Sequence, residues 1–112
     1  MSRPLYQAKA EFFRALGHPA RIRVLELLSE REHAVHELLA AIDIEPSNLS
    51  HQLAVLRRMG LVVQDRRDGQ VLYSLAAPEV ADLLRAARRV LLDVIDDAAL
   101  RKELRGPRKR AS

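Results

Sequence analysis

The most restrictive feature of this 112-residue chain is the short connection between two segments whose apolar residues recur at helical spacing. The first segment runs from Val35 to Ile42 and the second from Pro46 to Met59, so only Asp43-Ile44-Glu45 lies between them. Pro46 suits the first position of a helix, because its missing N–H would have no intrahelical partner there. Two helices joined by three residues are typical of a helix-turn-helix unit.

After Gly60 the apolar pattern changes from helical to extended. Leu61 to Arg66 and Gln70 to Leu75 are typical of strands. Asp68-Gly69 between them is a strong signal for a two-residue hairpin turn, because glycine tolerates positive φ. A hairpin that follows a helix-turn-helix unit predicts a winged helix.

Three further segments are predicted to be helical. Pro4 to Leu16 and Pro78 to Leu104 each carry an apolar stripe, and Pro19 to Ser29 is apolar on more than one face, as expected of a buried central helix. The fold class is therefore mainly α with a small β-hairpin, in the order α-α-α-α-β-β-α. We expect one domain over residues 1–104 and a basic, disordered tail over 105–112.

Composition limits the class of protein. The chain contains no cysteine, which excludes disulfides, thiolate metal sites and thiol-based redox sensing. No apolar run approaches the roughly 20 residues that span a bilayer, and no signal-peptide pattern opens the chain, so we expect a cytoplasmic protein. The net charge of +4 comes from the C-terminal end of the chain, since six basic residues after position 100 face a single acidic one. Global basicity therefore says little about a binding surface in the folded part.

The second helix of the helix-turn-helix unit has no acidic residue, and none occurs between Glu45 and Asp65. Its leucines at helical spacing are expected to face inward: Leu49, Leu53 and Leu56. The polar residues near its N-terminal end are expected to face outward: Ser47, Asn48, His51 and Gln52. Hydroxyl and amide groups can bond to base edges in the major groove of DNA, whereas a carboxylate would repel the phosphates. Arg57 and Arg58, two to three turns further along, could reach phosphates.

The hairpin follows the same chemistry. Arg66 and Arg67 precede its tip and Gln70 and Tyr73 follow it, so two cations and an aromatic hydroxyl could lie along the DNA backbone or in the minor groove. Asp65 and neighbouring Asp68 partly offset this charge. Each of these residues alone could belong to a solvated surface without a partner, but the combination favours DNA binding.

Three motifs together resemble the ArsR/SmtB family of bacterial winged-helix repressors: ALGHPARIRVLELL (residues 15–28), SNLSHQLAVLRRMGLV (47–62) and RRDGQVLYSL (66–75). The resemblance implies a homodimer that binds palindromic operator DNA and loses affinity when an effector is sensed. It places the base contacts on Ser47, Asn48, Ser50, His51 and Gln52, and the wing contacts on Arg66, Arg67 and Gln70. It also implies a dimer interface on the first and last helices, which we assign to Leu5, Phe12, Leu83, Leu84, Ala87, Val90, Leu91 and Val94.

Departures from the family pattern concern the cap and the metal ligands. Glu45 stands where the family usually has a serine or threonine N-cap. The third helix lacks cysteine, and the last helix offers four aspartates, Asp82, Asp93, Asp96 and Asp97, but no histidine. Metal sensors of this family use a cysteine-containing motif on the third helix or a pairing of histidine and aspartate along the last one, so both ligand sets are incomplete here. We expect no metal or other cofactor. His33 and His36 lack a third soft ligand, so structural or solvent-exposed roles are favoured over a metal site.

An enzyme is not expected. The chain has no glycine-rich phosphate loop, nucleophile elbow or HExxH motif, and the neighbours Ser50 and His51 point about 100° apart on a helix. The prediction is a sequence-specific, dimeric DNA-binding regulator, most simply a repressor. Two alternatives remain: a winged-helix module that binds protein, against which the acid-free helix argues, and a metal-responsive sensor with a carboxylate and histidine site. On the last helix we expect ion pairs of Asp82 with Arg85 or Arg89, and of Asp97 with Arg101.

Overall fold

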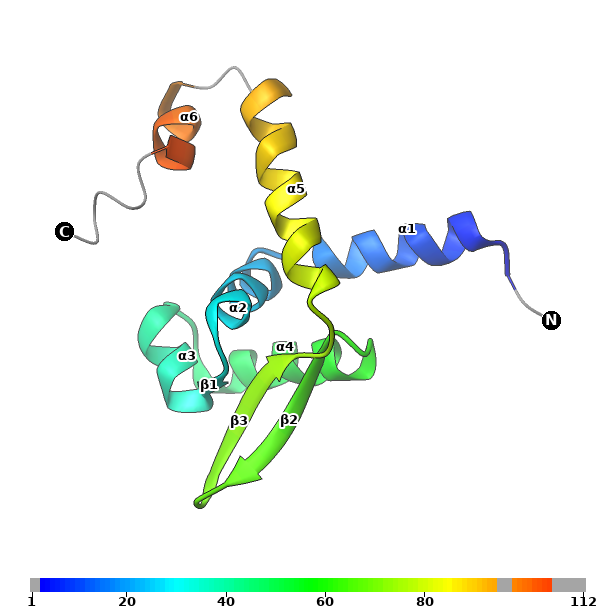
Figure 1. Cartoon of the computed structure of the whole chain (residues 1–112). Coiled ribbons are helices and arrows are strands. Elements are labelled where there is room, and N and C mark those ends of the chain that lie inside the picture. Colours follow the sequence, from blue (N-terminus) through cyan, green and yellow to red (C-terminus); the bar gives the residue numbers. More distant parts are fainter. Residues whose placement is uncertain (1–2, 95–97, 106–112) are drawn as a thin grey trace.

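The computed structural model describes residues 3–94 and 98–105 of the chain. Along the sequence its elements are α1 (Leu5–Leu16), α2 (Pro19–Glu30), β1 (His33–Ala34), α3 (Val35–Ala41), α4 (Pro46–Arg58), β2 (Val62–Arg67), β3 (Gln70–Leu75), α5 (Glu79–Val94) and α6 (Ala98–Arg105), as Figure 1 shows. The predicted winged helix is confirmed. The four N-terminal helices and both hairpin strands lie within one residue of their predicted bounds.

The hairpin turns as the sequence predicts. Arg67 pairs with Gln70, so Asp68 and Gly69 alone form the turn, with φ values of 52° and 76°. Positive φ at both positions is the signature of a type I′ turn, whose twist matches that of the strands. The short strand β1 was not predicted. It adds to the outer side of β3, where His33 pairs with Tyr73, and the sheet order is β1-β3-β2.

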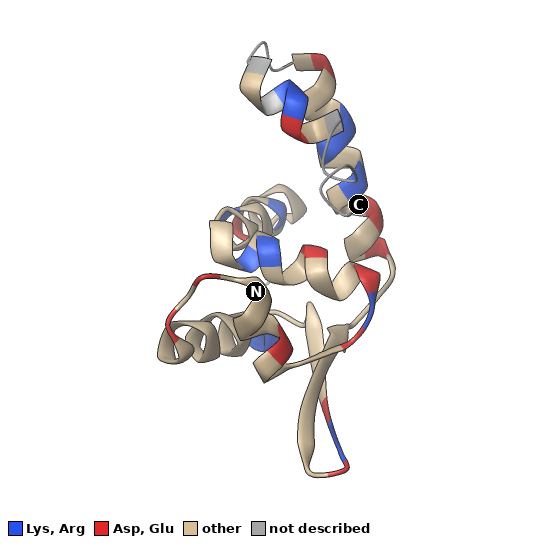
Figure 2. Ribbon diagram, turned by 90° about the vertical axis from the view of Figure 1, so that its left-hand side faces the viewer, with Lys and Arg blue, Asp and Glu red and all other residues tan. Residues whose placement is uncertain are grey.

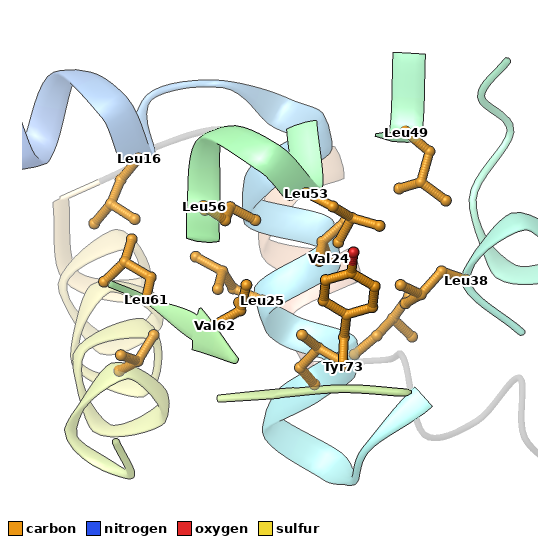
Figure 3. Packing of buried hydrophobic residues seen from close by; sticks show 13 residues of the cluster. Leu16, Val24, Leu25, Leu38, Leu49, Leu53, Leu56, Leu61, Val62 and Tyr73 are labelled. Carbon is orange, nitrogen blue, oxygen red and sulfur yellow. The ribbon is translucent and has the colours of Figure 1, made fainter. Parts of the chain in front are cut away.

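Helix α2 occupies the centre of the core, as its apolar pattern predicts. Val24 and Leu25 are fully buried, and the helix contacts α4, α5 and β3. In Figure 3 the side chains of Leu53 and Leu56 from α4 approach α2 from one side, while Tyr73 approaches from the sheet. The helix-turn-helix unit is thus held against α2 by its own apolar surface.

The prediction of one continuous helix from Pro78 to Leu104 is wrong. The structure has two helices there, and the Arg88 guanidinium donates a hydrogen bond to the backbone carbonyl of Leu104. In a continuous helix sixteen residues would span about 24 Å, far beyond the reach of one side chain. The chain therefore doubles back, and α6 lies beside the upper end of α5 in Figure 1.

The ion pairs and the tail expected for this region lie only partly within the described residues. Arg85 forms the expected ion pair with Asp82. The expected pair of Asp97 with Arg101 and the tail after residue 105 lie outside the described residues. Arg105 is the last residue of α6.

A carboxylate fixes the start of α3. The backbone N–H of Ala34 donates to Glu37 Oε1 at 2.8 Å, and Arg31 Nη2 lies 3.1 Å from Glu37 Oε2. The hydrogen bond from Ala34, followed by that from Arg31, holds the pKa of Glu37 below its ordinary value of 4.5. The ionised form is thus favoured by folding, and it satisfies a backbone donor at the first helix of the helix-turn-helix unit.

Glu37→Gln should therefore lower the stability of the protein in a pH-dependent way. A carboxylate whose pKa falls on folding stabilises above its unfolded pKa, and this contribution disappears as pH falls through the folded pKa. We expect the difference in urea midpoint between wild type and Glu37→Gln to be present at pH 7 and to shrink below pH 4.5, at one fixed protein concentration. Glu30→Gln, an exposed position at the end of α2, is the control. A difference that stays constant with pH would contradict a role for the Glu37 charge.

Candidate nucleic-acid interface

One side of α4 is exposed and carries no acid. The three leucines that were expected to face inward are buried, with exposed fractions of 0%, 2% and 0% for Leu49, Leu53 and Leu56. The polar residues at other positions around the helix are exposed: Ser47, Asn48, Ser50, His51, Arg57 and Arg58. Figure 2 shows α4 without acidic residues and with basic ones at its end. The structure thus gives this helix a polar outer surface of hydroxyl, amide and imidazole groups.

The N-terminal end of α4 lacks a side-chain cap. Glu45 occupies the N-cap position in extended conformation and makes no capping hydrogen bond, as expected for a poor cap residue. Pro46 follows at the first helical position. Within the described ranges, no side chain therefore accepts a hydrogen bond from the backbone N–H groups in the first turn of α4.

The expectation that Gln52 points outward is wrong. Its exposed fraction is 3%, its Oε1 accepts a hydrogen bond from Arg21 Nε at 2.8 Å, and its Nε2 donates to Asn48 Oδ1 at 2.9 Å. The position on the helix explains this burial. Gln52 follows Leu49 by three residues and precedes Leu56 by four, so it borders the apolar stripe rather than opposing it. Arg21 on α2 supplies the polar partner that a buried amide needs.

The wing presents one free cation and one that is already paired. Arg66 and Gln70 are exposed, and Arg66 forms no hydrogen bond or ion pair within the part of the chain that the structure describes. Arg67 contacts both carboxylate oxygens of Glu32, and its Nε lies 3.0 Å from Asp65 Oδ2. The hydrogen bond with Glu32 raises the pKa of Arg67, so the guanidinium stays charged. Figure 2 shows this mixture of charges at the hairpin tip.

Tyr73 was expected to offer its hydroxyl to DNA, but most of the residue is buried. Only 8% of the residue is exposed, and its ring belongs to the hydrophobic core (Figure 3). The physical reason is strand alternation, because Tyr73 shares its face of β3 with Val71 and Leu75, which also pack against the core. The period of two within β3 could have identified this from the sequence.

Arg57 links the end of α4 to the wing. Its Nη1 donates a hydrogen bond to Gln64 Oε1 on β2, while the neighbouring Arg58 has no such partner in the described ranges. The two arginines are therefore not equivalent. Arg58 keeps all its donors for solvent or another molecule, whereas Arg57 also joins two parts of the surface.

The histidines show no arrangement suited to a metal. His33 is buried in β1 with its Nδ1 2.9 Å from the carbonyl oxygen of Arg31, and His36 is exposed on α3. Among the residues that the structure describes, no group of three or more His, Asp or Glu side chains could hold a metal ion. No helix among these described residues is both long enough and apolar enough to cross a membrane.

Apolar side chains are exposed on the two helices expected to form a dimer. The most exposed large ones are Leu5, Tyr6 and Phe13 on α1, and Val90, Leu91 and Val94 on α5. Ala87 is exposed as well, whereas Phe12, Leu83 and Leu84 are half-buried and pack against the core. Tyr6 and Phe13 lie outside the apolar stripe from which the interface residues were predicted, yet they are exposed as well. Both helices project from the body of the molecule in Figure 1.

Comparisons with known proteins agree with this geometry. The sequence profile described as bacterial regulatory protein, arsR family, matches residues 18–63. The uncharacterized HTH-type transcriptional regulator Rv0081 of Mycobacterium tuberculosis is 57% identical over 107 residues, which cover 93% of each chain. The crystal structure of Rv0081 has a TM-score of 0.77 with 55% identity, and the match covers 88% of this chain and 99% of that one.

Two further solved structures extend the comparison. The transcriptional repressor BigR of Xylella fastidiosa has a TM-score of 0.68 and 32% identity, covering 82% of this chain and 91% of that one. A homodimeric winged helix-turn-helix DNA-binding domain, Mb0332 of Mycobacterium bovis, has a TM-score of 0.69 and 29% identity, covering 77% and 80%. The fold and the exposed α4 define a winged helix-turn-helix transcriptional regulator. The chain belongs to the arsR family of bacterial regulatory proteins.

Proposed function

We propose that this chain is a homodimeric repressor that binds palindromic operator DNA, with α4 in the major groove and the β2–β3 hairpin against the phosphate backbone. The observation that carries the proposal is the outer surface of α4, where exposed hydroxyl, amide and imidazole groups occur without any carboxylate. Such groups can both donate to and accept from base edges. We assign base contacts to Ser47, Asn48, Ser50 and His51, and phosphate contacts to Arg57, Arg58, Arg66 and Gln70.

The exposed apolar surfaces support the dimer. Tyr6 and Val94 are 72% and 67% exposed, which is costly for large apolar side chains on helices that carry further exposed apolar residues. Burial against the same surface of a second chain would give a closed twofold assembly. Such a dimer would present two copies of α4 about 34–36 Å apart, which is one turn of DNA.

The remaining assignments follow from this role. Residues 1–104 would form the DNA-binding and dimerisation unit, and the basic residues of 105–112 would add affinity that does not depend on sequence. A repressor acts by binding rather than by catalysis, and it works where chromosomal DNA is, in the bacterial cytoplasm.

The direct test is selection of duplexes from a random-sequence pool, followed by gel shifts with competitor DNA. We expect an enriched inverted repeat whose half-sites lie about 10 base pairs apart, since the recognition helices of a dimer follow the helical repeat. Ser50→Glu should abolish the shift, because a carboxylate on α4 would face the phosphates. His36→Glu, which places the same group on the exposed side of α3, is the control. Failure to enrich any sequence would overturn the proposal.

The two wing arginines should differ in their contribution to binding. Arg66→Ala should lower the slope of log affinity against log salt by about one unit, because a free cation releases about one counterion on contact with a phosphate. Arg67→Ala should lower it less, since Glu32 and Asp65 already compensate that charge. Glu32→Gln should raise affinity. An unchanged slope for Arg66→Ala would remove the wing from the interface.

The dimer can be tested by sedimentation equilibrium. Val90→Glu places a carboxylate in the exposed apolar surface of α5, and the twofold axis repeats it in the partner. We expect dissociation to monomers, because burial of an unpaired carboxylate costs several kcal/mol. Val63→Glu, at an exposed apolar position on β2, should leave the dimer intact. A wild-type mass of one chain would contradict the proposed assembly.

A further inference from the structure

Arg21 joins three helices through hydrogen bonds of fixed direction. From α2, its Nη1 donates to the carbonyl oxygen of Ala15 in α1 at 2.8 Å, and its Nε donates to Gln52 Oε1 in α4 at 2.8 Å. A guanidinium has donors and no acceptor. The atom of Gln52 that faces Arg21 must therefore be its oxygen, which settles an amide orientation that is often ambiguous.

The orientation of the Gln52 amide in turn fixes the orientation of the Asn48 amide. With its oxygen toward Arg21, Gln52 turns its NH₂ group to Asn48, and Nε2 donates to Asn48 Oδ1 at 2.9 Å. The atom of Asn48 that accepts this bond must be its oxygen. Its own NH₂ group is then directed away from Gln52, and within the described ranges Nδ2 donates no hydrogen bond. Asn48 is exposed in the first turn of α4.

We propose that Arg21 and Gln52 are positioning residues that set the polarity of Asn48, so that α4 offers an NH₂ donor at this position to a hydrogen-bond acceptor on DNA. This inference rests on the proposed function. The acceptor is a phosphate oxygen or an acceptor atom on a base edge, such as guanine N7 or O6 or thymine O4. Gln52, at 3% exposure, does not contact DNA itself.

Burial makes the orientation stable. If Gln52 reversed its amide, an NH₂ group would face the Arg21 donor and leave both groups unpaired in a partly buried site. Asn48 is therefore held in one of its two orientations before DNA arrives, which reduces the ordering cost of binding. The charged residue that sets this choice lies 31 positions away from Gln52 in the sequence.

Gln52→Glu tests the orientation without DNA. A carboxylate can still accept from Arg21, but it cannot donate to Asn48, so Asn48 must reverse and donate its NH₂ group inward. In NMR spectra of the wild-type protein we expect a slowly exchanging side-chain NH₂ for Gln52 and a rapidly exchanging one for Asn48. In Gln52→Glu the Asn48 NH₂ should become the protected one. Unchanged exchange at Asn48 would overturn the proposal, and thermal unfolding checks that the variant is folded.

The contribution to binding is tested with a double-mutant cycle on the duplex that wild type selects. Wild type, Gln52→Glu, Asn48→Ala and the double variant are compared on that duplex and on single base-pair changes of it. We expect Gln52→Glu to weaken binding roughly threefold to tenfold, the value of one neutral hydrogen bond. In the Asn48→Ala background the same change should have little further effect, because its target is gone.

The pattern of losses identifies the acceptor. A loss confined to one base pair in each half-site indicates a base edge, and an equal loss on all duplexes indicates a phosphate. Equal effects of Gln52→Glu with and without Asn48 would overturn the inference, because the new charge would then act independently. If wild type selected no sequence, the proposed function and the DNA contact of Asn48 would both fall, while the NMR result would still decide the amide orientation.

Discussion

Burial of the leucine stripe of α4 against α2 is the interaction on which the rest of the surface depends. Leu49, Leu53 and Leu56 are almost completely removed from solvent, and α2 behind them is buried as well. This packing fixes the rotation of α4 about its own axis, so it determines which side chains face outward. The chemistry of the exposed surface is therefore a consequence of where three leucines lie.

Local sequence patterns predict most of this fold. The period of the apolar residues, the proline at Pro46 and the Asp68-Gly69 turn act within a few residues of their position, and the elements they predict occur within one residue of the expected bounds. Strand β1 was not predicted, because two residues are too few to show the alternation of apolar and polar side chains that is typical of a strand. The separation of α5 and α6 was not predicted, because both helices are amphipathic and their apolar residues together give the pattern of one long helix.

The candidate site was predicted less completely, because it depends on tertiary contacts that the local sequence does not show. Gln52 and Tyr73 are polar enough to suggest contact with DNA, yet each lies at the border or on the inner face of its element. In the sequence Arg67 has the pattern of a free cation, but in the fold Glu32, 35 positions away, contacts it. Helical and strand periodicity could have predicted that Gln52 and Tyr73 face inward, but no local sequence pattern predicts the partners of Arg21 and Arg67.

The uncapped start of α4 has a consequence for how an anion would be received. Water must solvate the first backbone N–H groups of the helix in the free protein, since Glu45 does not bond to them. An approaching oxyanion would replace only that water, and no bond within the protein would be broken. A helix capped by serine or threonine would first have to break the hydrogen bond to its capping side chain. Glu45 is a poorer cap and stabilises α4 less, but it leaves the backbone N–H groups at the start of the helix more accessible.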